Sequence, residues 1–132
     1  MNNLRMFCLS LNPDHLKLIK KINYTPVGLG DANFSEEWMS DKNGKNISNK
    51  NQNYGEYTFH YWLWKNYLDQ INSDWVGFCQ YRKFFLQKNI NERDIHLNVL
   101  EQNVLKSIPS KLDTYDCILG EKSPVDNYRL KF

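Results

Sequence analysis

Two positively charged side chains stand at the end of an apolar run in the middle of the chain. Residues 74–80 form the run, and Tyr81, Arg82 and Lys83 follow it. An arginine offers a planar fork of N–H donors that matches phosphate oxygens, and a lysine adds a compact charge. If the run is a strand of an open parallel sheet, its carboxyl end is where such sheets bind ligands. The pair therefore indicates a site for an anionic ligand, the alternative being ordinary solvated charges.

A polar loop rich in amides and hydroxyls leads into an aromatic segment. The loop covers residues 31–53 and holds the hydrogen-bonding candidates Asp41, Asn46, Ser48, Lys50 and Asn51. Such groups are what sugar hydroxyls and base edges require. Loops of this length are usually functional or disordered. We therefore predict a ligand-binding loop, the alternative being a turn-rich loop whose side chains bond their own backbone.

Glu56 has two competing interpretations. With Asn53 as N-cap, it completes the capping-box pattern of a helix start. As a carboxylate facing a pocket, it could orient a sugar or act as a general base. Tyr54 and Tyr81 could stack on a nucleobase or a sugar ring. Alternatively, they could pack in the core with their hydroxyl groups hydrogen-bonded.

The other chemistry-bearing residues are expected to be structural. We place Trp62, Trp64 and a hydrogen-bonded His60 in the core, and His15 and His96 on the surface. Three cysteines lie in apolar runs and are expected to be buried, reduced thiols, namely Cys8, Cys79 and Cys117. No spacing of cysteines or histidines suggests zinc, so no metal ligand is assigned.

The expected elements alternate between strands and helices. Apolar runs typical of strands cover residues 5–11, 24–30, 74–80 and 115–119. Helical spacing covers residues 15–22, a segment starting at 53, and 93–108. Pro26 should lie at the start of its strand or place that strand at an edge. The aromatic helix is apolar nearly all round, so we expect it to be packed on both sides. The order predicts an α/β domain with a mainly parallel sheet flanked by helices.

The bulk composition is that of one globular domain. The chain has 132 residues, of which 41% are hydrophobic and 14% aromatic, enough to bury a core. The net charge of +2 and the scattered lysines argue against a nucleic-acid partner. No apolar run approaches a membrane span and no signal peptide is visible, so we expect a cytoplasmic location, with peripheral membrane association still open.

Two segments resemble a known family. They are Asn46-Ile-Ser-x-Lys-Asn-x-x-Tyr-x-Glu-x-Thr-x-x-Tyr-Trp-x-Trp-Lys-Asn66 and Gly77-Phe-Cys-Gln-Tyr-Arg-Lys-Phe84. They look like the capsular-polysaccharide-type glycosyltransferases, long filed as a domain of unknown function, over residues 24–120. The resemblance implies transfer of a sugar from a nucleotide-diphosphate sugar to a glycan acceptor in surface-polysaccharide biosynthesis. It also implies a Rossmann-like (GT-A-like) scaffold, with residues 1–132 as a single nucleotide-sugar-binding domain. We expect this to be either the N-terminal part of a longer family domain or a minimal version.

The chemistry of the residues, supported by the resemblance for the loop residues, gives two kinds of site candidate. The catalytic candidates are Glu56 and Arg82. The substrate-binding candidates are Asp41, Asn46, Lys50, Asn51, Tyr54, Tyr81 and Lys83.

The chain departs from the family pattern in two places. Gly55-Glu56-Tyr57-Thr58 replaces the usual Cys-Glu-Leu-Thr, and Gln80-Tyr81-Arg82-Lys83 replaces His-Tyr-Arg-Arg. The second change removes the only obvious imidazole base at this strand end. The Asp-x-Asp metal motif of many GT-A enzymes is also absent there, which favours a metal-independent or cation-assisted mechanism and leaves metal dependence open. The alternatives are a non-catalytic nucleotide- or carbohydrate-binding module, a truncated remnant, or a purely structural domain.

Overall fold

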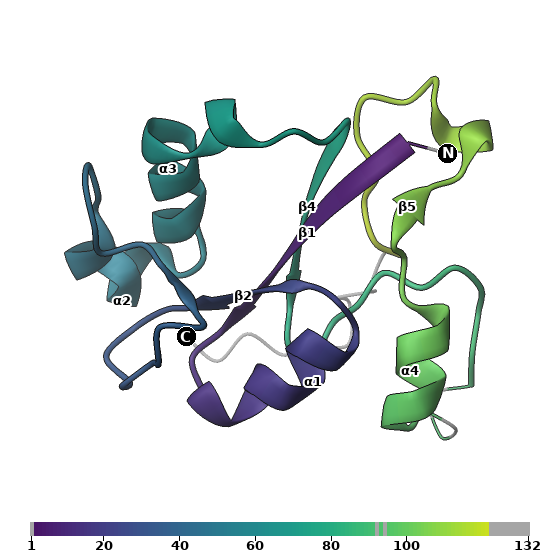
Figure 1. Ribbon diagram of the computed structural model, residues 1–132, viewed down its shortest axis with the longest axis horizontal. Coiled ribbons are helices and arrows are strands. Elements are labelled where there is room, and N and C mark those ends of the chain that lie inside the picture. The colour runs from purple at the N-terminus through teal and green to yellow at the C-terminus, as the bar shows by residue number, and fades with distance from the viewer. Residues whose placement is uncertain (1, 92, 94, 122–132) are drawn as a thin grey trace, which may run out of the picture.

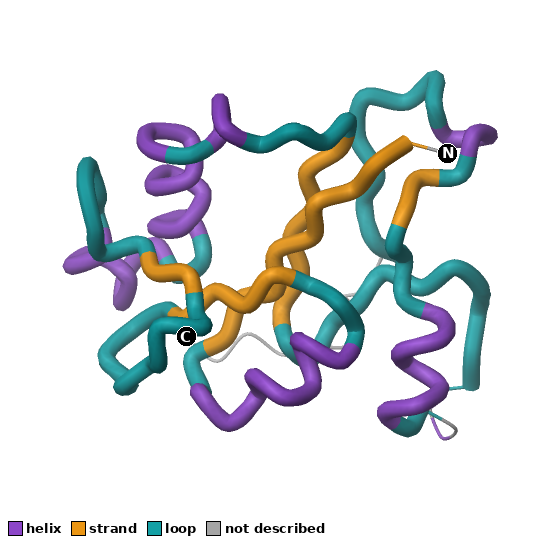
Figure 2. Tube along the Cα trace, viewed as in Figure 1, coloured by secondary structure: helices purple, strands orange, loops and turns teal. Residues whose placement is uncertain are grey.

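A mainly parallel β-sheet forms the centre of the computed structural model, which describes residues 2–91, 93 and 95–121 (Figures 1 and 2). Its parallel strands are β1 (Asn2–Ser10), β2 (Thr25–Gly28), β3 (Met39–Ser40) and β4 (Trp75–Gln80). They lie in the order β3-β2-β1-β4, and β5 (Ser107–Ile108) pairs antiparallel with the start of β1. The predicted α/β class is confirmed, and the arrangement is Rossmann-like.

Helices cover both faces of the sheet. They are α1 (Leu16–Lys21), α2 (Asn51–Tyr54), α3 (Tyr57–Asn66) and α4 (Leu97–Asn103). Short 3-10 turns are η1 (Pro13–His15), η2 (Ser48–Lys50), η3 (Leu68–Gln70) and η5 (Ser110–Leu112). Figure 1 shows α3 on one side of β1 and β4, and α1 on the other. No helix in the described part of the chain is long and apolar enough to cross a membrane.

Alternate residues of β1 face two separate hydrophobic clusters. The cluster on the α1 side includes Met6, Cys8, Ile19, Ile22 and Leu100. The cluster on the α3 side includes Phe7, Leu9, Val27, Phe59 and Leu63. Because side chains alternate across a strand, one continuous apolar run supplies both faces of a central strand.

The expectation that α3 is packed on both sides is wrong. Its buried residues are Thr58, Phe59 and Leu63, whereas Tyr57 is 64% exposed and Trp64 is 61% exposed. Trp64 is therefore not a core residue; the Lys65 ammonium lies 3.1 Å from its ring centroid. One face of α3 packs on the sheet, so its outward aromatics remain in solvent.

The predicted capping box is also wrong. Gly55, with φ 54° and ψ −130°, separates α2 from α3, so Asn53 lies within α2 and is not the N-cap. Glu56 occupies the N-cap position of α3 but forms no capping hydrogen bond. A glycine can adopt this backbone conformation without a Cβ clash, and the break frees the Glu56 side chain for another contact.

Two predictions in the C-terminal half fail. The helix expected at residues 93–108 covers only Leu97–Asn103, because Val104 turns to an extended conformation. The buried Val104 and Leu105 instead pair with an extended segment, through a bridge to Leu86 and a bond to the Phe85 carbonyl. Residues 115–119 form no strand; residues 116–119 and residues of β4 line an apolar cavity of about 350 Å³.

The structure also decides the predictions for Pro26 and for the three cysteines. Pro26 is the second residue of β2, so the alternative that places it at a strand start is correct. Cys8 and Cys79 are buried, but Cys117 is exposed, and none of the three forms a disulfide. The two-residue β3, which has no sequence signal, follows the buried Trp38.

Candidate functional site

A cavity of about 690 Å³ opens at the carboxyl ends of β1, β2 and β4. Ser10 ends β1, Leu29 and Gly30 follow β2, and Gln80 ends β4; all four line the cavity. The chain leaves β1 toward β2 on one side, while β4 lies on the other. The cavity therefore lies where the strand order reverses, which is where open α/β sheets bind ligands.

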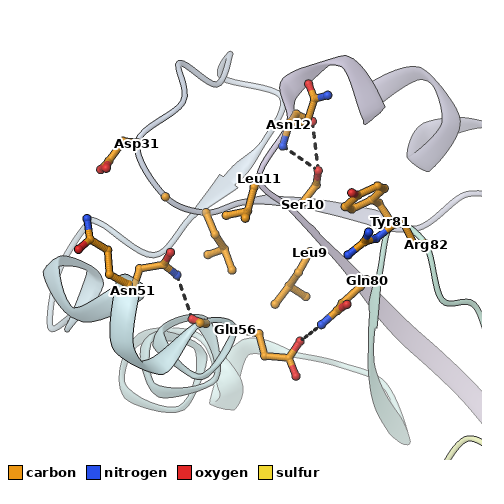
Figure 3. A pocket seen from close by; sticks show the side chains of 14 residues that line it. Leu9, Ser10, Leu11, Asn12, Asp31, Asn51, Glu56, Gln80, Tyr81 and Arg82 are labelled. Carbon is orange, nitrogen blue, oxygen red and sulfur yellow. Dashed lines mark hydrogen bonds between the residues drawn. The ribbon is translucent and has the colours of Figure 1, made fainter. Parts of the chain in front are cut away.

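Polar side chains from four segments surround this cavity (Figure 3). They include Ser10, Asn12, Asp31, Asn51, Gln52, Glu56, Gln80 and Arg82. Three leucines add apolar surface, namely Leu9, Leu11 and Leu29. Amides, carboxylates and one guanidinium over an apolar floor suit a hydroxyl-bearing ligand that also carries negative charge.

A hydrogen bond fixes the Glu56 carboxylate at the cavity wall. The amide Nε2 of Gln80 donates to Oε2 of Glu56 at 2.8 Å, as Figure 3 shows. Glu56 stands directly before the first turn of α3 and is half-buried. Gln80 ends β4, so an amide at this strand end holds the carboxylate.

Asn51 holds the turn that presents Glu56. Its Nδ2 donates to the Gly55 carbonyl at 2.9 Å and to the Thr58 hydroxyl at 3.1 Å. The Gly55 amide in turn donates to the Asn51 carbonyl at 2.8 Å. Asn51, predicted to bind substrate, therefore lines the cavity and also orders its wall.

Arg82 and Tyr81 line the cavity at the end of β4. The Arg82 guanidinium carbon lies 5.2 Å from the Tyr81 ring centroid. The structure thus brings four predicted site residues to one cavity, namely Asn51, Glu56, Tyr81 and Arg82.

His15 lies beside the site, although we expected it on the surface. Its half-buried ring stacks on Tyr81 with centroids 3.9 Å apart, and its Nδ1 lies 2.7 Å from the Ser10 hydroxyl. His15 thus links the ends of β1 and β4. The available sequence signal was its position shortly after the first strand, at the same edge as Tyr81.

His60 differs from the hydrogen-bonded core residue that we expected. It is half-buried beside Phe78, with ring centroids 4.3 Å apart, and its buried Nε2 has no described hydrogen-bond partner. Burial lowers the pKa of His60 below its usual range, partly opposed by the nearby Glu56 carboxylate.

The remaining predicted site residues lie outside this cavity. Asp41, at the end of β3, is 1% exposed, and its carboxylate oxygens have no hydrogen-bond partner among the described residues. Asn46 donates to the carbonyls of Lys42 and Gly44, as in the self-bonded-loop alternative. Lys50 and Tyr54 are exposed.

Lys83 does not line this cavity but another one, of about 310 Å³, which is distinct from the 350 Å³ cavity beside residues 116–119. The expected pair of cations is therefore divided between two cavities. The ligand-binding roles of the residues outside the first cavity stay predictions.

No group of three or more histidine, cysteine, aspartate or glutamate side chains suited to a metal ion occurs within residues 2–91, 93 and 95–121.

Comparison with known proteins identifies the family of the chain. The model of the family described as "Domain of unknown function (DUF4422)" matches residues 12–131. No curated protein and no solved structure match the sequence. Because the family match extends over nearly the whole chain, this protein belongs to the DUF4422 family.

Proposed function

We propose that this domain is a glycosyltransferase that binds a nucleotide-diphosphate sugar in the 690 Å³ cavity and transfers the sugar to a glycan acceptor. The observation that carries the proposal is that the Glu56 carboxylate and the Arg82 guanidinium line the same cavity at the strand-order reversal. A carboxylate can accept the proton of an attacking hydroxyl, and a guanidinium can neutralise a departing diphosphate.

Two features of the cavity favour negative charge that develops on the leaving group, and they act against the Asp31 and Glu56 carboxylates in the same lining. The N-terminal end of α3 faces the cavity through Gly55 and Glu56, and helix N-termini carry partial positive charge. Arg82 adds a full positive charge on the β4 side. A diphosphate that gains negative charge in the transition state is stabilised more than the intact donor, which lowers the barrier.

The remaining lining suits the sugar and the nucleoside. Asn12, Asp31 and Asn51 supply acceptors and donors for hydroxyl groups, and the leucines supply an apolar surface for a ring face. A volume of about 690 Å³ also lies within the range of small-molecule sites, roughly 300–1,000 Å³. The proposal assigns the diphosphate to Arg82 alone, because Lys83 lines the other cavity.

Titration calorimetry with uridine, guanosine and thymidine diphosphates tests donor binding. We expect at least one to bind, and Arg82→Ala to weaken it by about 1.5 kcal/mol, or roughly tenfold, the low end for a charged hydrogen bond at an exposed side chain. Arg93→Ala, which removes an exposed arginine that does not line the cavity, is the matched control. Absence of binding at millimolar concentrations would refute the proposal.

A second measurement separates an enzyme from a binding module. With the bound nucleotide identified, release of that nucleotide from its sugar conjugates should occur with the native protein and fall strongly in Glu56→Gln. Glu56→Gln should leave nucleotide affinity nearly unchanged, because the base acts on the acceptor hydroxyl. Nucleotide binding without any turnover would support the non-catalytic alternative.

A further inference from the structure

Two cavities share the hydrogen-bonded pair Glu56 and Gln80. The first is the 690 Å³ cavity at the ends of β1, β2 and β4, and the second is the 310 Å³ cavity that contains Lys83. Glu56 and Gln80 line both, so this pair forms the part of the wall that the cavities have in common. A carboxylate in such a wall can contact a ligand in each cavity.

We propose that the second cavity is the acceptor subsite and that it takes a saccharide carrying both a free hydroxyl and a negatively charged group. This inference rests on the proposed function and extends it to the acceptor. It gives Glu56 a defined position where the two cavities adjoin, in contact with an acceptor hydroxyl that lies next to the anomeric carbon of the donor.

The transfer step follows from that position. The acceptor hydroxyl gives its proton to the Glu56 carboxylate, and its oxygen forms a bond to the anomeric carbon of the donor. The bond between that carbon and the diphosphate oxygen breaks, and its electron pair leaves with the nucleoside diphosphate toward Arg82. Oε2 of Glu56 already accepts a hydrogen bond from Gln80. Oε1 has no hydrogen-bond partner among the described residues, so it can take the proton.

A tight turn divides the two cations between the cavities. The Lys83 amide donates to the Gln80 carbonyl at 2.9 Å, and this turn directs Arg82 to the first cavity and Lys83 to the second. Each cavity therefore has one cation in its described lining. Arg82 serves the diphosphate, so the Lys83 ammonium is available for an anionic group of a different ligand.

The remaining lining of the second cavity fits a sugar ring. Phe78, Phe84 and Phe85 are half-buried there and offer apolar surface on which the carbon–hydrogen face of a pyranose can pack. Together with Lys83 and Glu56, they select an acidic saccharide. Its charge can come from the carboxylate of a uronic acid or from the phosphate of a sugar phosphate, which offer the same anionic oxygens to Lys83.

Saccharide titrations of the full chain test the subsite, with glucuronic acid, glucose 6-phosphate and glucose as probes, each with and without uridine diphosphate. At least one acidic sugar should bind more tightly than glucose, by about fivefold, as expected for one exposed ion pair. Preference for glucuronic acid would identify a carboxylate ligand, and preference for glucose 6-phosphate a phosphate ligand. Lys83→Ala should remove the preference, whereas Lys88→Ala, at an exposed lysine outside the cavity, should keep it.

The same variants separate this inference from the proposed function. Lys83→Ala should leave nucleotide affinity unchanged, and Arg82→Ala should leave the preference for the acidic sugar unchanged. Equal binding of all three sugars, or a preference that survives Lys83→Ala, would overturn the acceptor subsite while nucleotide binding stands. An acidic sugar that competes with the nucleotide would also overturn it, because the two ligands would then share one cavity.

Discussion

Replacing Gly55 by alanine tests whether the wall of the first cavity depends on backbone conformation. Gly55 has φ 54° and ψ −130°, a combination that is essentially restricted to glycine. A Cβ built at this position meets no atom within 4 Å. The substitution therefore introduces backbone strain without a steric clash, and a non-glycine residue in such a region costs about 1–3 kcal/mol.

A control is needed because alanine also acts on the unfolded chain. Gly→Ala restricts the unfolded backbone and stabilises by about 0.4–1 kcal/mol where the native conformation permits it. Gly120→Ala measures this contribution, since Gly120 is exposed, has no atom within 4 Å of its Cβ position and lacks a positive φ. We expect the free energy of unfolding of Gly55→Ala to lie about 1–3 kcal/mol below that of Gly120→Ala.

Urea unfolding followed by tryptophan fluorescence gives both free energies. Relaxation of the strained turn would also break the hydrogen bond from Asn51 to the Gly55 carbonyl and move Glu56. Gly55→Ala should therefore reduce sugar transfer as well as stability. Equal stabilities of the two variants, within about 0.5 kcal/mol, would refute the argument that this turn requires glycine.

Three further predictions concern the core, a histidine and the thiols. Phe59→Ala should lower the free energy of unfolding by about 3–5 kcal/mol in urea, because Phe59 is fully buried, whereas Tyr57→Ala on the exposed face should change it by less than about 0.5 kcal/mol. Folding lowers the pKa of His60, so below pH 6.5 the unfolded chain binds a proton at this residue more readily than the folded chain does. The free energy of unfolding should therefore fall as the pH drops below 6.5. His60→Phe should remove that part of the pH dependence, and an unchanged profile would contradict the assignment. In the folded protein a thiol reagent should modify the exposed Cys117 but not Cys79, whose pKa is raised by the hydrogen bond that its thiol forms to Cys8 on the neighbouring strand and by burial. Mass spectrometry before and after unfolding distinguishes them.

Hydrophobic periodicity predicted the central elements well. The apolar runs at residues 5–11 and 74–80 correspond to β1 and β4, and the helical spacing at 15–22 corresponds to α1. β1 is readable because a central parallel strand must be apolar on both faces, and β4, at the end of the described strand order, carries a similar apolar run. Finding β4 also located Tyr81 and Arg82 at a strand end, which is why part of the site could be predicted.

Other parts of the site depend on contacts that the sequence does not display. The bond between Glu56 and Gln80 forms only because Gly55 interrupts the helix, whereas the local pattern favoured a capping box. His15 reaches Tyr81 because β1 and β4 are neighbours, and strand order cannot be read from periodicity. The apolar residues Val104 and Leu105 fit a helix by spacing but are buried as an extended segment, since tertiary packing overrides local propensity.

The central place of β1 has a consequence for how the chain is made. β1 is synthesised before its register partners on β2 and β4, which follow only at residues 25–28 and 75–80. Parallel pairing over such separations is slow to form. Until the ribosome has released β4, one edge of this apolar strand has no native partner along most of its length, and the nascent protein should be most prone to aggregation in that interval.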